Sequence, residues 1–171
     1  MKKFTLIVLC LLLTVSLFSC VTDNVGGNSE GGANTQNGSK YVFNVASKNN
    51  YTVKLDMNMK EVLEALGEPL SYFEAASCAF DGLDKTYTYA GFQILTRPDG
   101  DKDYINSIIL TDDSVTTPEG VYIGVTEADV TAKYGTPAQK TDTLLSYTDG
   151  GTALNFILKN GTVISIEYIP A

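Results

Sequence analysis

An internal repeat constrains this chain more than any other feature of its sequence. The segment 55–62 matches 123–130 without a gap, at an offset of 68 residues. The match continues from Leu-Gly-Glu-Pro at 66–69 to Tyr-Gly-Thr-Pro at 134–137. Self-similarity at a fixed offset indicates two copies of one structural unit. We therefore expect residues 41–171 to form a globular domain of two repeats, about 41–113 and 114–171.

Each repeat is predicted to begin with a short helix. Asn58 and Thr126 are residue types that cap a helix N-terminus, and an acidic residue follows each of them three positions later. Gly67 and Gly135 supply the left-handed residue at which helices end, and a proline two positions on prevents continuation. Apolar residues four positions apart give each helix one core-facing side.

Antiparallel strands are expected after each helix, and turn signals separate the last two strands of each copy: Pro98-Asp99-Gly100 and Asn160-Gly161. The expected strands are 87–89, 92–96, 105–110, 145–147, 154–158 and 163–168. Residues 72–83 are an extra strand or loop in the first copy, and residues 41–45 and 51–55 form a leading hairpin. These patterns predict an α+β fold, a tandem duplication of a helix plus about three antiparallel strands, with the helices packed on one face of the sheet.

The N-terminus has the pattern of an export signal. Two lysines precede an apolar run of about 15 residues, which suits a signal peptide and is short for a membrane span. The run ends in Leu17-Phe18-Ser19-Cys20, which resembles the lipobox of bacterial lipoproteins. This resemblance implies a signal peptide at 1–19, a lipid on Cys20 and an extracytoplasmic protein anchored to the cell membrane. The alternatives are an uncleaved anchor or an ordinary signal peptide. Residues 20–40, rich in Gly, Asn and Ser, are expected to be a flexible tether.

The tandem pattern also resembles known protein families. A helix that ends in Leu-Gly-x-Pro, followed by a meandering sheet and repeated behind a lipobox, resembles the beta-lactamase-inhibitor-protein-like fold and the small lipoproteins of outer-membrane assembly. It is most similar to uncharacterised secreted lipoproteins of Gram-positive gut and soil bacteria. The resemblance covers about 115 residues from Leu55 onward and implies a protein-binding scaffold. Because the shared motifs are caps, glycine stops and hairpins, they carry over no contact residue.

Charge and cysteine content narrow the classes of function. The net charge is −8, and removal of the two lysines of the signal peptide takes it to −10. An acidic protein is a poor match for nucleic acid, whereas a basic protein partner remains open. Cys78 has no cysteine partner once Cys10 is removed and Cys20 is lipidated, and we expect it to be a buried, inert thiol.

The residues that commonly carry catalysis are scarce. The chain has no histidine, which excludes histidine-based triads and His-containing zinc sites. Asp99, Asp101 and Asp103 are weak candidate ligands for Ca²⁺, but the spacing fails the EF-hand pattern, so a solvated hairpin tip is the preferred interpretation. We therefore expect no catalytic residue, no metal and no cofactor.

Strand parity selects a candidate binding face. The face expected to lie away from the helices carries apolar residues, which pack one repeat on the other or bind a partner. These residues are Leu95, Ile105, Ile109, Ile157 and Val163. The preferred function is a membrane-tethered protein-binding module of unknown partner; the alternative is a carboxylate-dependent hydrolase or a Ca²⁺-binding envelope protein. If the stripe is core, the loops around 77–84 become the next candidate.

Overall fold

The structure is a computed structural model that describes residues 38–171. The expected signal peptide, the lipidated Cys20 and almost all of the expected tether lie outside the described residues. The elements, in chain order, are β1 (Phe43–Val45), η1 (Ala46–Lys48), β2 (Tyr51–Val53), α1 (Met59–Leu66), β3 (Ser71–Ala76), β4 (Leu83–Tyr89), β5 (Phe92–Asp99), β6 (Lys102–Leu110), α2 (Glu127–Tyr134), β7 (Gln139–Thr141), β8 (Leu144–Asp149), β9 (Thr152–Lys159) and β10 (Thr162–Pro170).

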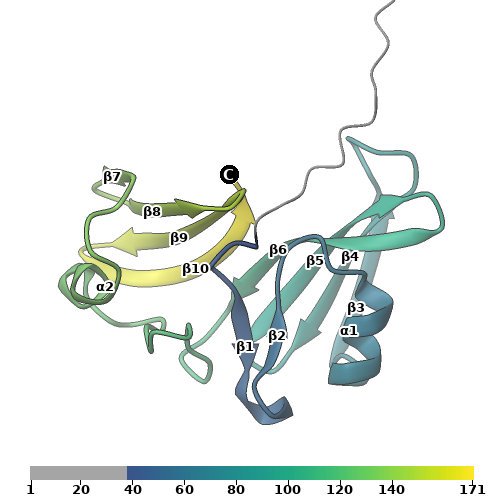
Figure 1. Ribbon diagram of the computed structural model, residues 1–171, viewed down its shortest axis with the longest axis horizontal. Coiled ribbons are helices and arrows are strands. Elements are labelled where there is room, and N and C mark those ends of the chain that lie inside the picture. Colours follow the sequence, from purple (N-terminus) through teal and green to yellow (C-terminus); the bar gives the residue numbers. More distant parts are fainter. Residues whose placement is uncertain (1–37) are drawn as a thin grey trace, which may run out of the picture. The chain divides into compact units, whose positions relative to one another are not determined.

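Eight of the strands form one antiparallel sheet with the order β3-β4-β5-β6-β10-β9-β8-β7 (Figure 1). Each half of the sheet is a four-stranded meander, and the last strands of the two halves pair at the centre. The pairing of β6 with β10 places Leu110 opposite Ile166 and Ile108 opposite Tyr168. The first strand of each half, β3 or β7, therefore lies at an outer edge.

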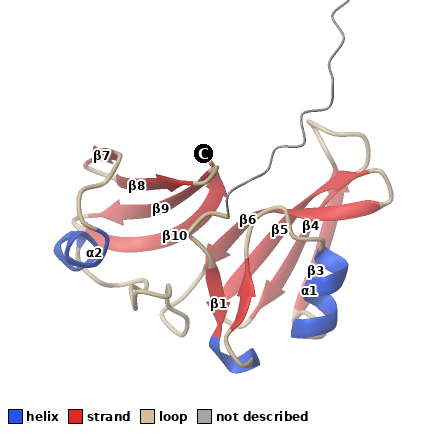
Figure 2. Ribbon diagram, viewed as in Figure 1, coloured by secondary structure: helices blue, strands red, loops and turns tan. Residues whose placement is uncertain are grey.

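The predicted α+β fold, with helices packed on one face of the sheet, is wrong. The described part of the chain is mostly β structure, with the eight-stranded sheet, the two-stranded sheet β1–β2 and two α-helices of eight residues each (Figure 2). A helix of that length spans only about 12 Å, so two of them cannot form a layer over eight strands. Of the residues in α2, only Val130 is buried. Caps and glycine stops predict where a helix begins and ends, but they do not predict how much of the fold is helical.

The helix boundaries themselves agree with the sequence pattern. Asn58 caps α1 by accepting a hydrogen bond from the backbone N–H of Lys60, and Thr126 forms a capping box with Asp129 at the start of α2. Gly67 and Gly135 follow the helices with φ of 79° and 75°. The N–H of each glycine still donates to a carbonyl group of its helix. The helix ends at the glycine because the residues that follow do not have helical backbone angles.

The two halves repeat their hydrogen bonds as well as their order of elements. Before α1, Asp56 donates its N–H to the carbonyl oxygen of Ile105 at 2.9 Å; before α2, Gly124 donates to Val163 at the same distance. After the helices, the Tyr89 hydroxyl donates to the Gly67 carbonyl and the Tyr147 hydroxyl donates to the Gly135 carbonyl, both at 3.1 Å. Each helix is thus tied at both ends to the strands of its own half.

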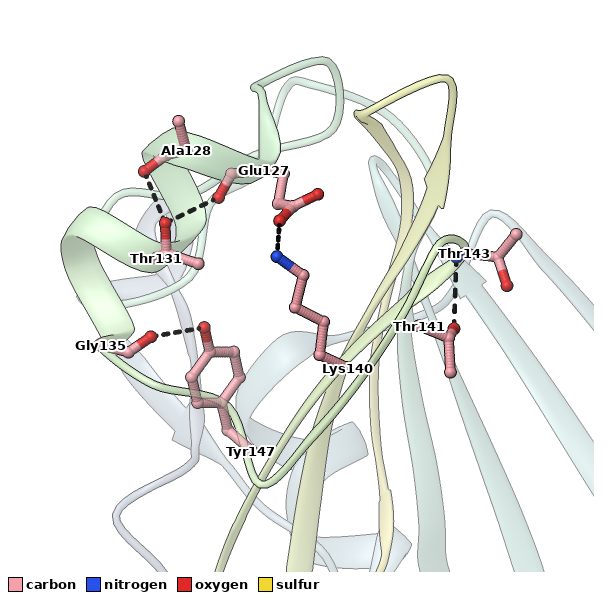
Figure 3. Close-up of polar contacts among 8 residues, drawn as sticks. All are labelled: Glu127, Ala128, Thr131, Gly135, Lys140, Thr141, Thr143 and Tyr147. Carbon is pink, nitrogen blue, oxygen red and sulfur yellow. Dashed lines mark hydrogen bonds and ion pairs between the residues drawn. The ribbon is translucent and has the colours of Figure 1, made fainter.

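Around α2 these ties are drawn in Figure 3. The Lys140 ammonium of β7 pairs with the Glu127 carboxylate in the first turn of the helix, and Tyr147 of β8 reaches the helix end at Gly135. The Thr131 hydroxyl donates back to the carbonyl groups of Glu127 and Ala128. The short helix is therefore positioned from both neighbouring strands and buries little apolar surface of its own.

The core lies on one face of the sheet, where alternate strand residues are buried as parity predicts. The predicted core positions Tyr87, Tyr89, Phe92, Ile94, Ile108, Leu110, Leu154, Phe156, Ile166 and Tyr168 are all buried. The hairpin β1–β2, which the sequence predicted, adds Phe43 at the centre, with its ring 4.9 Å from Phe92 and 6.3 Å from Tyr168. Because Phe92 and Tyr168 come from different halves, Phe43 joins the two halves across the middle of the sheet.

Two β-bulges overturn part of the predicted binding face. The β5–β6 pairing moves from Leu95–Ser107 to Thr96–Ile105 and skips Asn106, and the β9–β10 pairing skips Ile164 in the same way. One extra residue reverses the side to which the rest of a strand points. Ile105 and Val163 are therefore fully buried in the core, at 0% exposure. Ile105 and Val163 do not belong to the face away from the helices, where parity had predicted them, and they offer no binding surface.

Candidate functional site

The remaining residues of the predicted face do not form a continuous apolar stripe. Leu95, Ile109 and Ile157 are half-buried on the side of the sheet away from the core. On the neighbouring strands Ile109 lies between Gln93 and Glu167. Polar partners separate the apolar side chains, so this face offers no large hydrophobic surface of the kind that marks a binding site.

The two edges of the sheet differ in a way that the sequence analysis missed. The strand β7 at one edge has three residues, Gln139–Thr141, all polar. The strand β3 at the other edge has six residues, Ser71–Ala76, and every one of them is exposed. Natural proteins usually shorten, charge, kink or cover an edge strand, because its free backbone groups recruit other strands. The strand β7 is short and polar, whereas β3 is twice as long and carries one charged residue, Glu74.

Exposed hydrophobic side chains gather on the same edge. Five of the seven large exposed hydrophobic residues in the described part of the chain belong to β3 or to the segments next to it, with Leu70 at 76% and Phe73 at 66% exposure. We call this set the edge-hairpin surface: Leu70, Tyr72, Phe73, Phe80 and Leu83. Apolar side chains clustered on one hairpin, in place of being scattered, indicate a contact surface.

The hairpin β3–β4 is longer than its counterpart β7–β8. Tyr72 pairs with Tyr87 as Lys140 pairs with Leu145, but residues 74–85 of the first hairpin correspond to residues 142–143 of the second. The extra residues lengthen β3 and add the loop 77–82. Because the core of the half is already complete without them, this extension buries nothing that the second half lacks. Such an insertion in one copy of a repeat was the available sequence signal for this site.

The two sides of β3 carry different chemistry. On the core side of the sheet the Tyr72 ring lies 5.1 Å from the Tyr87 ring, and the Tyr72 hydroxyl donates to the Glu74 carboxylate. On the opposite side Phe73 pairs with Thr86, which in turn pairs with Leu95. One side of the edge therefore carries aromatic rings and Glu74, and the other carries Phe73 and Ala75 next to Thr86 and Asp84.

The hairpin β3–β4 has a net negative charge, because residues 71–89 hold three acidic residues, Glu74, Asp81 and Asp84, and one basic residue. These three acidic side chains are exposed. The basic residue, Lys85, has its ammonium 2.7 Å from the Asp103 carboxylate. The Arg97 guanidinium lies 5.8 Å from the Phe80 ring and 3.0 Å from the Asp56 carboxylate. The one base of the hairpin is thus paired with an acid of β6, and the hairpin keeps a net negative charge.

The position of Cys78 differs from the prediction. It was expected to be a buried thiol, but it lies exposed in the β3–β4 loop. The prediction of burial rested on the apolar neighbours of Cys78 in the segment Ser-Cys-Ala-Phe. The loop that holds this segment extends beyond the paired strands, so its hydrophobic residues do not reach the core.

The aspartates at the β5–β6 turn do not converge on a metal site. Within residues 38–171 no group of three or more His, Cys, Asp or Glu side chains is placed to hold a metal ion. Of the weak candidates Asp99, Asp101 and Asp103, the last is engaged with Lys85. Asp99 pairs with Lys102 and Asp103 pairs with Pro98, so the side chains of Asp99 and Asp103 lie on opposite sides of the hairpin.

A pocket of about 530 Å³ lies between α1 and the β5–β6 turn. It is lined by charges of both signs, among them Lys60, Glu61 and Asp103, and by Tyr87. Burial raises the pKa of Tyr87 to about 12, assisted by the nearby carboxylates of Asp103 and Glu74. The tyrosine therefore stays protonated at neutral pH and is not available as a base.

In the part of the chain that the structure describes, no helix has the length and hydrophobicity needed to cross a membrane. No family model and no curated protein matches the chain. A solved structure that is similar to it is the crystal structure of an extracellular protein containing a SCP domain from Bacillus anthracis str. Ames, with 12% sequence identity and a TM-score of 0.43. That similarity covers 88% of this chain and 50% of the other, so the chain spans about half the length of that one.

Proposed function

We propose that this chain is an extracytoplasmic lipoprotein, anchored to the cell membrane through Cys20, whose domain binds a protein partner through the edge-hairpin surface. The anchor is supported by the lipobox-like sequence that ends at Cys20, and an acidic domain held near a membrane resists lying flat on anionic lipid. In this role the domain has no catalytic task, and the protein partner supplies any activity.

One observation carries the binding function: a six-residue edge strand that is exposed along its whole length and surrounded by exposed hydrophobic side chains. Burying a side chain such as Phe73 against a partner contributes about 1.5 to 3 kcal/mol relative to leaving it in water. Leu70 and Phe73 are 76% and 66% exposed, so folding of the domain alone leaves most of their apolar area in water.

Site-specific photo-crosslinking in the native host tests this proposal. A p-benzoyl-phenylalanine in place of Phe73 should give a discrete covalent adduct with one envelope protein. The matched control is the same amino acid in place of Tyr122, which is 41% exposed and lies in the loop before α2. A discrete adduct at 73 and none at 122 supports the site. The same adducts at both positions, or none at 73, would overturn it.

A further inference from the structure

We propose that the partner adds a strand to β3, and that this strand alternates basic and apolar residues. This inference rests on the proposed protein-binding function and specifies how the partner is recognised. Strand addition to an exposed sheet edge obtains its affinity from main-chain hydrogen bonds and its specificity from alternate side chains. At β3 both the free main-chain groups and the alternating side chains can be identified.

The backbone of β3 is open for pairing along about 20 Å. Its six residues pair with β4 in an uninterrupted register from Ser71–Thr88 to Ala76–Leu83, with no bulge to twist the edge away. At the hairpin end Ser77 donates its N–H to the Gly82 carbonyl at 3.0 Å. In an antiparallel ladder the hydrogen-bonded pairs alternate, so the backbone groups of Tyr72, Glu74 and Ala76 point away from β4. These are the groups that an added strand would bond.

The side chains of β3 define which residues the added strand carries. Tyr72 and Glu74 share one side, where the exposed Glu74 lies opposite Lys85, whose ammonium is paired with the Asp103 carboxylate. Phe73 and Ala75 share the other side, next to Thr86 and Asp84 of β4. Residues directly opposite on paired strands have their side chains on the same side. A basic residue therefore fits the Glu74 side and an apolar residue fits the Phe73 side.

Charge selects this occupant over a second copy of the chain. Edge-to-edge pairing of two β3 strands would bring together two hairpins that each hold three acidic residues and one basic residue, and that basic residue is already paired with Asp103. Like charges placed opposite each other in a sheet are destabilising. A basic segment meets the same region with attraction, and its binding should weaken as salt screens the charges.

The other edge of the sheet provides an internal comparison. The strand β7 has half the length of β3, and its one charged side chain, Lys140, is paired with Glu127 of α2. A strand added there would find few backbone groups and no apolar side chain. The edge available for strand addition is therefore β3.

Peptide binding to the full chain in detergent micelles tests the inference, measured by fluorescence anisotropy. The probe is a labelled eight-residue peptide of alternating lysine and valine. It should bind at least tenfold more tightly than a peptide of the same composition in paired blocks and than a glutamate–valine peptide. Methylation of every second backbone nitrogen of the lysine–valine peptide removes the hydrogen-bond donors along one edge of the peptide. This change should weaken binding by a similar factor.

Two variants of the chain complete the test. Ala76→Pro removes an outward N–H, and proline is tolerated at such an edge position. Glu74→Lys reverses the charge that faces the probe. Each should weaken binding about tenfold or more. Asp142→Lys, which makes the same charge change at the exposed tip of the β7–β8 hairpin, should leave binding unchanged.

The outcomes separate this inference from the proposed function. Equal binding of the methylated and unmethylated peptides would overturn strand addition, and equal binding of the acidic peptide would overturn the basic partner. If either occurs while the crosslink at position 73 persists, protein binding stands and its mode is different. A dimer of the chain in analytical ultracentrifugation that Phe73→Ser abolishes, with no effect of Ile164→Ser, would assign β3 to a second copy and overturn the inference.

Discussion

Three tyrosine hydroxyl groups near the core illustrate how differently one polar atom can be accommodated. The hydroxyl groups of Tyr89 and Tyr147 each donate to the carbonyl group of the glycine that ends a helix. The hydroxyl group of Tyr168 is buried with no hydrogen-bond partner among the described residues. Burial raises the pKa of Tyr168, because ionisation in such a site has no compensation. Removal of a bonded hydroxyl and of an unbonded one should therefore have different effects.

Tyr147→Phe should lower the free energy of unfolding by about 1 kcal/mol, since the helix end at Gly135 loses its only side-chain donor from β8. Tyr168→Phe should leave the free energy of unfolding unchanged or raise it slightly, because a buried unpaired hydroxyl is itself unfavourable. Urea denaturation followed by circular dichroism measures both. Equal losses in the two variants would show that the hydroxyl of Tyr168 has a partner in solution.

At the scale of the element, the short helices depend on their endings. Gly67 has φ 79° and ψ −170°, and Gly135 has φ 75° and ψ −145°, a region of backbone space that only glycine occupies readily. A Cβ atom at Gly135 would meet no other atom within 4 Å, and at Gly67 it would meet only the Lys48 ammonium at 3.9 Å. Any penalty for a side chain at these positions comes from the backbone conformation alone.

Gly67→Val and Gly135→Val should each lower the free energy of unfolding by about 1 to 3 kcal/mol, because valine resists positive φ. The control is Ala132→Val, an exposed position inside α2 where valine meets ordinary helical geometry. There the loss should stay near 0.5 kcal/mol, the difference in helix propensity. Losses no larger at the glycines than at Ala132 would contradict the assigned helix ends.

The two edge strands, β3 and β7, are equivalent elements of the two halves, but they differ in length and composition. Both follow a helix, a glycine and a proline, and both pair with the next strand. In β7 the strand stops after three polar residues, whereas β3 continues for six and carries Tyr72 and Phe73. The duplicated framework is thus kept by the buried residues, and the difference between the copies is concentrated where nothing is buried.

At the scale of the whole molecule, the domain is one continuous sheet whose halves meet at β6 and β10. The seam is covered by Phe43, which contacts rings from both halves, so the halves share a core. The proposed anchor at Cys20 lies outside the described residues and is separated from this core by the Gly- and Asn-rich segment. Anchoring and folding should therefore be separable by mutation.

Cys20→Ala should abolish incorporation of labelled fatty acid and leave the precursor uncleaved, because the acceptor thiol is removed. Cys78→Ala is the matched control, since Cys78 is the exposed cysteine of the domain, and labelling should persist. Metabolic labelling followed by gel electrophoresis measures both lipid and processing. Fatty acid still incorporated in the Cys20 variant would refute the anchor.

Much of the local structure could be predicted from sequence. The helix ends at Gly67 and Gly135, the leading hairpin and the core positions on the inner strands follow from caps, turn residues and alternation of two. These features are set by residues a few positions apart, so their signals lie close together in the chain. The same signals overstated the helices, which are too short to act as a layer and made the α+β prediction wrong.

The sequence by itself determined where helices stop, where strands turn and which alternating residues are apolar. The tertiary structure alone decided to which face of the sheet Ile105 and Val163 point. Each bulge arises from the pairing of two strands and reverses the alternation of side chains beyond it. The tertiary structure also decided that β3 is an edge and that Cys78 is exposed, since both depend on which strands lie alongside and which segment has no neighbour. Alternation therefore predicts burial along regular inner strands, whereas at bulges, edges and loops exposure depends on which strands assemble alongside.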